Sequence, residues 1–195
     1  MYENNSEDLT TEIIDEFMFN YYSSEKIRLI AFEWESNELL KERMSILRNV
    51  IMAHNLGMYN VTIPTLLTQL EGVLIDTFNI RGKVDGKIIE LLLECLLKDD
   101  NNESGFNFDT EIHEYYTKNI IQSFKHGEPI KSGISRNAIL HGADKRYGIL
   151  SNSLKTILLF DYISNAGFCI DKDKQQRGRE KIKIHRKNRY PKKRK

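Results

Sequence analysis

Residues that interrupt helices are sparse in this 195-residue chain. Prolines occur only at positions 64, 129 and 191, and Gly57, Gly82 and Gly142 follow segments in which apolar residues recur at helical spacing. No useful length of sequence alternates apolar and polar residues, as a half-buried strand would. The sequence therefore predicts an all-α fold, a compact bundle of about five to six helices.

The helical segments follow from this periodicity and from the turn signals between them. A short helix is also predicted around residues 13–22, where several aromatic residues occur. The main helices are predicted at 25–55, 62–78, 86–98, 108–124, 134–141 and 153–167. The third of these is apolar nearly all round, which predicts a central position.

Charge is distributed very unevenly along the chain, although the net charge is only +1. Residues 171–195 carry 13 Lys and Arg against three acidic residues, a net +10, whereas residues 1–170 are at −9. The basic end has almost no apolar residues, so we expect it not to pack. Three regions result: an acidic N-terminal segment (1–24), a helical domain (25–168) and a basic, disordered tail (169–195).

The basic tail has two compatible interpretations. It is a flexible solubilising tail that folds back on the acidic body, or it binds the RNA backbone by counterion release, with arginines and a tyrosine stacking on bases. We favour RNA, because basic runs of this density are typical of nucleic-acid patches. The candidate RNA-binding residues are Arg177, Arg179, Lys181, Lys183, Arg186, Lys187, Arg189, Tyr190, Lys192, Lys193 and Arg194.

Several enzyme classes lack their motifs here. The chain has no GxxxxGK[ST] loop, GxGxxG, HExxH or GxSxG, and no His and carboxylate cluster at metal-ligand spacing. Cys95 and Cys169 stand alone, the N-terminus is acidic, and no apolar run approaches the roughly 20 residues of a membrane helix. We therefore expect a cytoplasmic protein that needs no metal or cofactor and that works, if it is an enzyme, with side chains alone.

Metal-free RNA cleavage needs a proton acceptor, a proton donor and a cation for the phosphorane, roles that suit His and Arg. Arg followed by His after four to six residues is expected roughly once by chance in such a chain. It occurs three times, as Arg48 with His54, Arg136 with His141, and Arg179 with His185. The spacing alone therefore identifies no site.

Helical geometry favours the second pair. The Arg179 pair lies in the basic tail, where an Arg near any His is expected. Asn137 and His141 are four residues apart and share a helix face, whereas the Arg48 set diverges within a long helix. His141 also precedes a helix stop and a polar loop that could admit RNA. The alternative is that His141 is only a last-turn cation that favours the helix dipole.

The segment "SRNAILHG", followed by "YG…NSLKTILLFDYI", resembles the signature of HEPN domains. These are compact α-helical domains, widespread in prokaryotic toxin–antitoxin and phage-defence systems, and many are metal-independent endoribonucleases. Arg136, Asn137 and His141 match the family's Arg, polar residue and His. The upstream stretch that ends in "QLEGVLID" resembles the segment before the motif in some such proteins, with Gln69 and Glu71 as its polar residues. The resemblance covers roughly residues 42–163.

The resemblance implies catalytic roles for Arg136, Asn137 and His141, in a composite site where two protomers of a homodimer meet. It also implies that Glu71 orients a site residue by a hydrogen bond, although the interpretation preferred for Glu71 is a solvated helix residue. A separate nucleotidyltransferase-like antitoxin chain is a further implied partner. Some HEPN domains have lost activity, so a catalytically inactive RNA-binding or protein-interaction module stays open.

Overall fold

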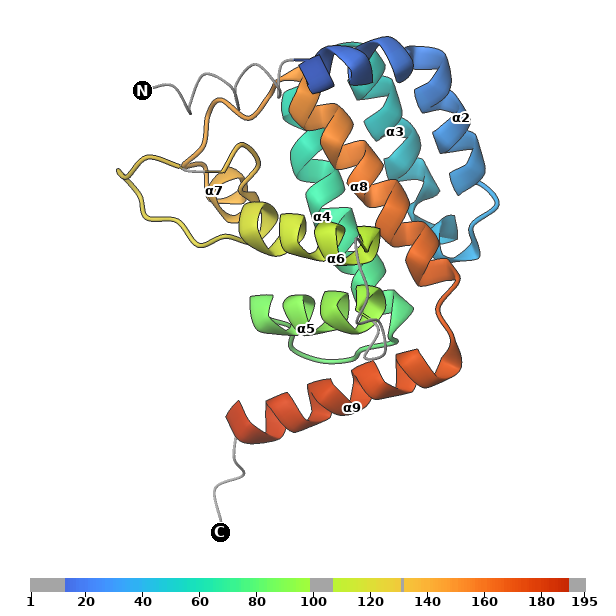
Figure 1. Cartoon of the computed structure of the whole chain (residues 1–195), viewed down its shortest axis with the longest axis vertical. Helices are drawn as coiled ribbons and strands as arrows, with labels where there is room; N and C mark the ends of the chain where they lie inside the picture. The colour runs from blue at the N-terminus through green and yellow to red at the C-terminus, as the bar shows by residue number, and fades with distance from the viewer. Residues whose placement is uncertain (1–12, 99–106, 131, 190–195) are drawn as a thin grey trace.

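The computed structural model of the chain describes residues 13–98, 107–130 and 132–189 (Figure 1). These residues are helical or irregular, and no strand occurs among them, so the all-α prediction is confirmed for this part of the chain. Residues 13–21 are helical. The later elements are α2 (Ser24–Trp34), η1 (Glu38–Arg43, a 3-10 helix), α3 (Met44–Asn55), α4 (Tyr59–Thr77), α5 (Gly86–Leu97), α6 (Phe108–Tyr115), η2 (Tyr116–Ile120, a π-helix), α7 (Arg136–Leu140), α8 (Leu150–Phe168) and α9 (Lys172–Arg189).

The core forms around α4 and α8, which pack against each other more extensively than any other pair (Figure 1). Leu66, Leu70 and Leu74 of α4 and Ile157 and Phe160 of α8 are fully buried there. In Figure 1, α5, α6 and α9 run across the lower part of this bundle, while α7 lies to one side of α4. None of the described helices is both long and apolar enough to cross a membrane.

The predicted continuous helix at 25–55 is wrong, because the chain turns between Trp34 and Glu38. Asn37 begins a new helix there: its side-chain oxygen accepts a hydrogen bond from the backbone NH of Leu39, and its amide donates to the carbonyl of Ser164. Asn is favoured as such a cap because its short side chain replaces a missing helical acceptor. Apolar residues recur at helical spacing on both sides of this turn, so the sequence pattern does not reveal the turn.

The start of α4 also differs from its prediction. The helix begins at Tyr59 rather than Thr62, so Pro64 lies inside it. A proline there cannot donate a hydrogen bond to the carbonyl four residues earlier. That carbonyl belongs to Asn60, and it accepts instead from the hydroxyl of Tyr147, at 3.2 Å. Tyr147 thus covers this part of α4.

The predicted helix at 108–124 is shorter than expected, since regular structure ends at Ile120 after the π-turn of η2. The hydroxyl of Ser132 donates to the carbonyl of Asn119, at 2.6 Å, and Asn137 donates to the carbonyls of Ile121 and Gln122. Side chains from just before and within α7 therefore satisfy the carbonyls at this helix end. The consequence is that α7 is tied to the end of η2.

The prediction of a disordered tail over 169–195 is wrong for residues 172–189, which form α9 and pack along α5 (Figure 1). Gly178 and Ile182 are buried on its inner face, four residues apart. Arg186, four residues further, donates to the carbonyls of Arg81 and Lys83, at 2.7 Å each. One glycine, one isoleucine and fitted hydrogen bonds are enough to dock a helix whose composition is almost wholly polar.

Gly178→Ala is expected to destabilise the protein, although alanine has a higher helix propensity than glycine. Propensity alone would stabilise α9 by up to about 1 kcal/mol. However, a Cβ at position 178 would stand 2.4 Å from two carbons of the Phe78 ring, which is fully buried and cannot move aside. We expect a loss of about 2 kcal/mol, measured by urea unfolding.

Gly86→Ala is the matched control, because Gly86 also lies in a helix but a Cβ there would meet nothing within 4 Å. It should leave the unfolding midpoint unchanged or raise it slightly. A Gly178→Ala protein as stable as wild type would contradict the close packing of α9 on Phe78.

Candidate functional site

The short helix α7 is defined at both ends by hydrogen bonds of its own residues. Ser135 caps its start, with its hydroxyl accepting from the NH of Ala138 at 3.3 Å. At the other end the NH of Ala143 donates to the carbonyl of Ala138, and the NH of Gly142 donates to that of Ile139. With Gly142 at a φ of +71°, this pair of bonds is a Schellman motif. The helix stop predicted at Gly142 is confirmed, and His141 is the C-cap residue.

Arg136, at the first position of α7, faces α4 and forms an ion pair with Glu71. Its Nη2 donates to Oε2 of Glu71 at 2.7 Å, and its Nη1 donates to Oδ1 of Asn137 at 3.0 Å. The side chains of Arg136 and Glu71 are only 25% and 20% exposed. Burial raises the pKa of Glu71, while the charge and hydrogen bond of Arg136 act to lower it. The Nε of Arg136 is buried without a hydrogen-bond partner among the described residues.

The polar residues of "QLEG" in α4 thus bind two different arginines. Gln69 accepts from Nη1 of Arg43 at 2.9 Å, and the Arg43 guanidinium lies against Gly72, where a Cβ would be 2.7 Å away. Glu71 binds Arg136 instead. The interpretation of Glu71 as a solvated residue does not fit this geometry, whereas its expected hydrogen bond to a site residue is present.

His141 lies away from that ion pair, in an exposed position beside Phe124. The centroids of the two rings are 5.9 Å apart, and the planes are inclined by 31°. A second exposed histidine, His126, contacts the same Phe124 ring edge-on, with centroids 4.9 Å apart. The structure therefore places two imidazoles against one phenyl ring.

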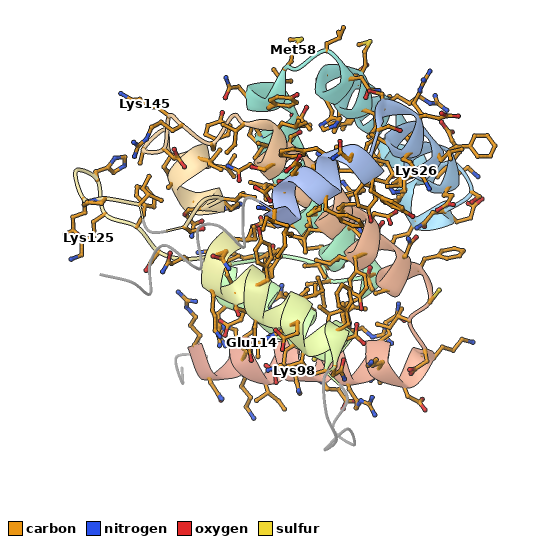
Figure 2. All side chains as sticks on the ribbon, turned by 45° about the horizontal axis from the view of Figure 1, so that its top comes forward. Lys26, Met58, Lys98, Glu114, Lys125 and Lys145 are labelled. Carbon is orange, nitrogen blue, oxygen red and sulfur yellow. The ribbon has the colours of Figure 1, made fainter. Side chains whose placement is uncertain are left out.

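Two clefts adjoin this cluster and share a wall at residues 128–130. The larger, about 710 Å³, is also lined by Asp144, Lys145 and Arg146. The smaller, about 200 Å³, is lined by Phe124 and by Ser135, the cap of α7. Figure 2 shows Lys125 and Lys145 projecting from the same side of the molecule. The cleft beside the end of α7 thus carries both basic residues, Lys145 and Arg146, and acidic ones, Glu128 and Asp144.

The three residues of the predicted motif do not form one hydrogen-bonded cluster. Arg136 and Asn137 are joined, but the Asn137 amide donates to the carbonyls of Ile121 and Gln122, and no side-chain hydrogen bond joins His141 to either residue within the described chain. Asn137 holds α7 in place. Arg136 and His141 are five positions apart, about 7.5 Å along the helix axis.

The structure agrees with setting aside the Arg48 and His54 pair. Arg48 forms a two-pronged ion pair with Glu35, at 2.7 and 2.6 Å, on the surface. His54 is buried, its Nδ1 lies 2.8 Å from Oγ of Ser153, and burial lowers its pKa. The third pair is likewise occupied, with Arg179 bonded to Gln175 and Gln176 of its own helix.

Apart from Arg179, which is bonded to Gln175 and Gln176 of its own helix, the candidate RNA-binding residues of α9 divide into two groups. Arg186 is bound to backbone carbonyls, Lys181 approaches Glu94 at 3.6 Å, and Arg189 binds Asp85 at 2.5 Å, so these three face the body. The exposed candidates without a hydrogen bond or ion pair to other described residues are Arg177, Lys183 and Lys187. Tyr190, Lys192, Lys193 and Arg194 lie outside the described residues.

Sequence reasoning missed His126, Phe124, Lys145 and Arg146. They lie in polar loops on either side of α7, and nothing in their spacing links 124–126 to 141. Hydrogen bonds from Asn137 to the carbonyls of Ile121 and Gln122, and from Ser135 to that of Gln122, bring the first loop to α7. No group of three or more His, Cys, Asp or Glu side chains in the described ranges is arranged to hold a metal ion.

No known family model matches the chain, and no curated protein or solved structure is significantly similar to it. The function therefore has to be inferred from the residues and their geometry.

Proposed function

We propose that the protein is a metal-independent endoribonuclease that cleaves RNA by attack of the 2′-hydroxyl group. The observation that carries this proposal is the arrangement on α7: an arginine held by Glu71 at its first position and an exposed histidine at its C-cap. Both ends of the helix are fixed by hydrogen bonds, so the two groups keep a constant separation. The resemblance to HEPN domains supports the same assignment.

In this reaction His141 exchanges a proton with the reacting oxygens, since imidazole titrates near neutral pH. Arg136 stabilises the negative charge of the phosphorane through its remaining N–H donors, and Glu71 orients its guanidinium. Lys145 and Arg146 attract the flanking phosphates to the larger cleft. The products are a 2′,3′-cyclic phosphate and a 5′-hydroxyl end.

The proposed biological setting is a bacterial toxin–antitoxin or phage-defence system. As in the family it resembles, the protein would act as a homodimer with the Arg136 and His141 of two protomers close together, and a nucleotidyltransferase-like chain would be its antitoxin. Co-purification of a second polypeptide and the mass of the assembly in solution test these partners directly.

The assay for the proposed activity is the cleavage of total RNA by the purified protein in excess EDTA, with analysis of the new ends. We expect cleavage to persist and every new 3′ end to carry a cyclic phosphate. Cleavage that stops in EDTA, or 3′-hydroxyl ends, would rule out this mechanism.

A second candidate is a non-enzymatic RNA-binding module. Two observations favour it: the side-chain amide of Asn137 is hydrogen-bonded to the backbone of the same chain, and Arg136 is paired with Glu71. Part of the motif is therefore already bound within the protein. Its binding surface is formed by the exposed Arg177, Lys183 and Lys187, which we call the outer face of α9. Truncation after Ile170 is a poor test, because it would also expose the Phe78 ring against which Gly178 packs.

Neutralising the outer face of α9 tests this surface without removing the helix. The triple variant Arg177→Gln, Lys183→Gln and Lys187→Gln is expected to weaken RNA binding and to flatten the slope of log K against log salt by about 2. The measurement is fluorescence anisotropy with a labelled single-stranded RNA at several salt concentrations.

The control neutralises three exposed lysines elsewhere, Lys26, Lys41 and Lys118, which should leave the slope closer to that of wild type. Equal effects of the two triple variants would mean that RNA senses only the net charge. The outer face of α9 would then not be an RNA-binding site.

A further inference from the structure

The cluster of His126, Phe124 and His141 contains a second histidine, His126, that the proposed mechanism does not use. Both imidazoles are exposed, and both contact one ring, at centroid distances of 4.9 and 5.9 Å. The two imidazoles can therefore be no farther apart than the sum of those distances. Phe124, the ring that both contact, is half-buried and lines the smaller cleft.

Cleavage of RNA by its own 2′-hydroxyl requires two proton transfers on opposite sides of phosphorus. A base takes the 2′ proton as the 2′-oxygen bonds to phosphorus, and an acid gives a proton to the 5′-oxygen as the P–O5′ bond breaks. The base ends protonated and the acid ends neutral, and exchange with water restores both. Two histidines at one site can supply the base and the acid at the same time, whereas one cannot.

Other histidines of the chain are unsuited to the second role. His54 and His113 are buried, and His185 lies on α9 near Asp85, at 3.9 Å. Asn137 donates to the carbonyls of Ile121 and Gln122, which shortly precede His126 in the chain. The position of His126 is therefore coupled to that of α7. The exposed side chains of His126 and His141 thus share one site on one chain.

We propose that His126 is the second proton-transfer group of the site, so that His126 and His141 of the same protomer act as the acid–base pair. This inference rests on the proposed ribonuclease function. It differs from a site in which the second histidine is the His141 of another protomer, because it makes each protomer's pair complete. Phe124 acts as the positioning residue that sets the distance between the imidazoles.

The first test compares RNA cleavage by His126→Ala, His141→Ala and wild type. Loss of a general acid or base lowers the rate by about 10²–10⁴-fold, so both variants should be slow. Lys118→Ala is the control, since Lys118 is exposed, pairs with Glu114 and lies outside the cluster. It should cleave at the wild-type rate.

The second test uses uridine 3′-(4-nitrophenyl phosphate), whose leaving group departs without a proton. The variant that lacks the acid should cleave this substrate at nearly the wild-type rate, while the variant that lacks the base stays slow. A residue needed only for folding or binding would show the same loss on both substrates. Circular dichroism and urea unfolding establish that both variants are folded.

The possible outcomes separate the two proposals. If His141→Ala is inactive on RNA and His126→Ala matches wild type, this inference is overturned and the proposed function stands. Equal losses for both variants on both substrates also overturn it. If the wild-type protein cleaves neither substrate, the proposed function fails and takes this inference with it.

Discussion

His141→Ala is expected to lower the rate of RNA cleavage by about 10²–10⁴-fold, the usual contribution of a general acid or base. His141 is exposed and its only ring contact among the described residues is with Phe124, so its removal should barely change stability. Arg136→Ala should lower the rate by about 10²–10³-fold through loss of phosphorane stabilisation. Both rates are measured on a defined RNA in EDTA, under single-turnover conditions.

The rival pair in α3 supplies the matched controls. Arg48→Ala removes an arginine of the same spacing from a surface ion pair with Glu35, and it should leave cleavage unchanged. His54→Ala should also retain activity per folded molecule, although it removes the buried contact with Ser153 and so lowers stability. If wild type, His141→Ala and Arg136→Ala degrade RNA alike, the activity comes from a contaminant and the catalytic assignment fails.

Helices with a continuous apolar face could be predicted from the sequence. Residues 86–98 are an example: Asp85 caps α5, and seven of its side chains are buried, as a helix apolar nearly all round should have. The break before η1 could not be predicted, because Asn37 acts through a carbonyl of Ser164, far away in the chain. The docking of α9 could not be predicted for a similar reason. Its contact with Phe78 depends on the absence of a side chain at Gly178, which composition cannot show.

The candidate site divides in the same way. Arg136, Asn137 and His141 were identified because they are close in the sequence, and the expected partner Glu71 lies within 2.7 Å of Arg136. His126 was missed because its link to His141 passes through Phe124 and through the tie between Asn137 and the end of η2. Spacing in the sequence identifies residues that lie on the same helix. Contacts between separate loops depend on tertiary hydrogen bonds, which spacing does not show.

Removing one partner of the Arg136–Glu71 pair is expected to destabilise the protein strongly, because the other charge is left in a mostly buried site. A fully buried pair would lose 3–5 kcal/mol, and the partial exposure of this one reduces the figure to about 2–3 kcal/mol. Arg136→Gln and Glu71→Gln should each show this loss in urea unfolding. The double variant leaves no unpaired charge, so it should lose no more than either single variant, a coupling of about 2–3 kcal/mol.

Acid should rescue one single variant and not the other. Without Arg136, burial alone acts on Glu71 and raises its pKa further above the unfolded value. A raised carboxyl pKa means that the folded state binds the proton more tightly, so stability is gained as pH falls through the folded pKa and is lost as it rises. Relative to the double variant, Arg136→Gln should therefore recover as the pH falls through the raised, folded-state pKa of Glu71. Glu71→Gln should not, because the guanidinium stays charged throughout.

The double variant also separates the two roles of Arg136. It lacks the guanidinium but has no unpaired charge in the site, so its fold should be nearly intact and His141 should stay on a properly capped α7. If Arg136 stabilises the phosphorane, this folded protein should still cleave RNA about 10²–10³-fold more slowly than wild type. If it cleaves at the wild-type rate, Arg136 serves only to hold α7 on α4, and the cation of the reaction must be sought at Lys145 or Arg146, which line the adjoining cleft.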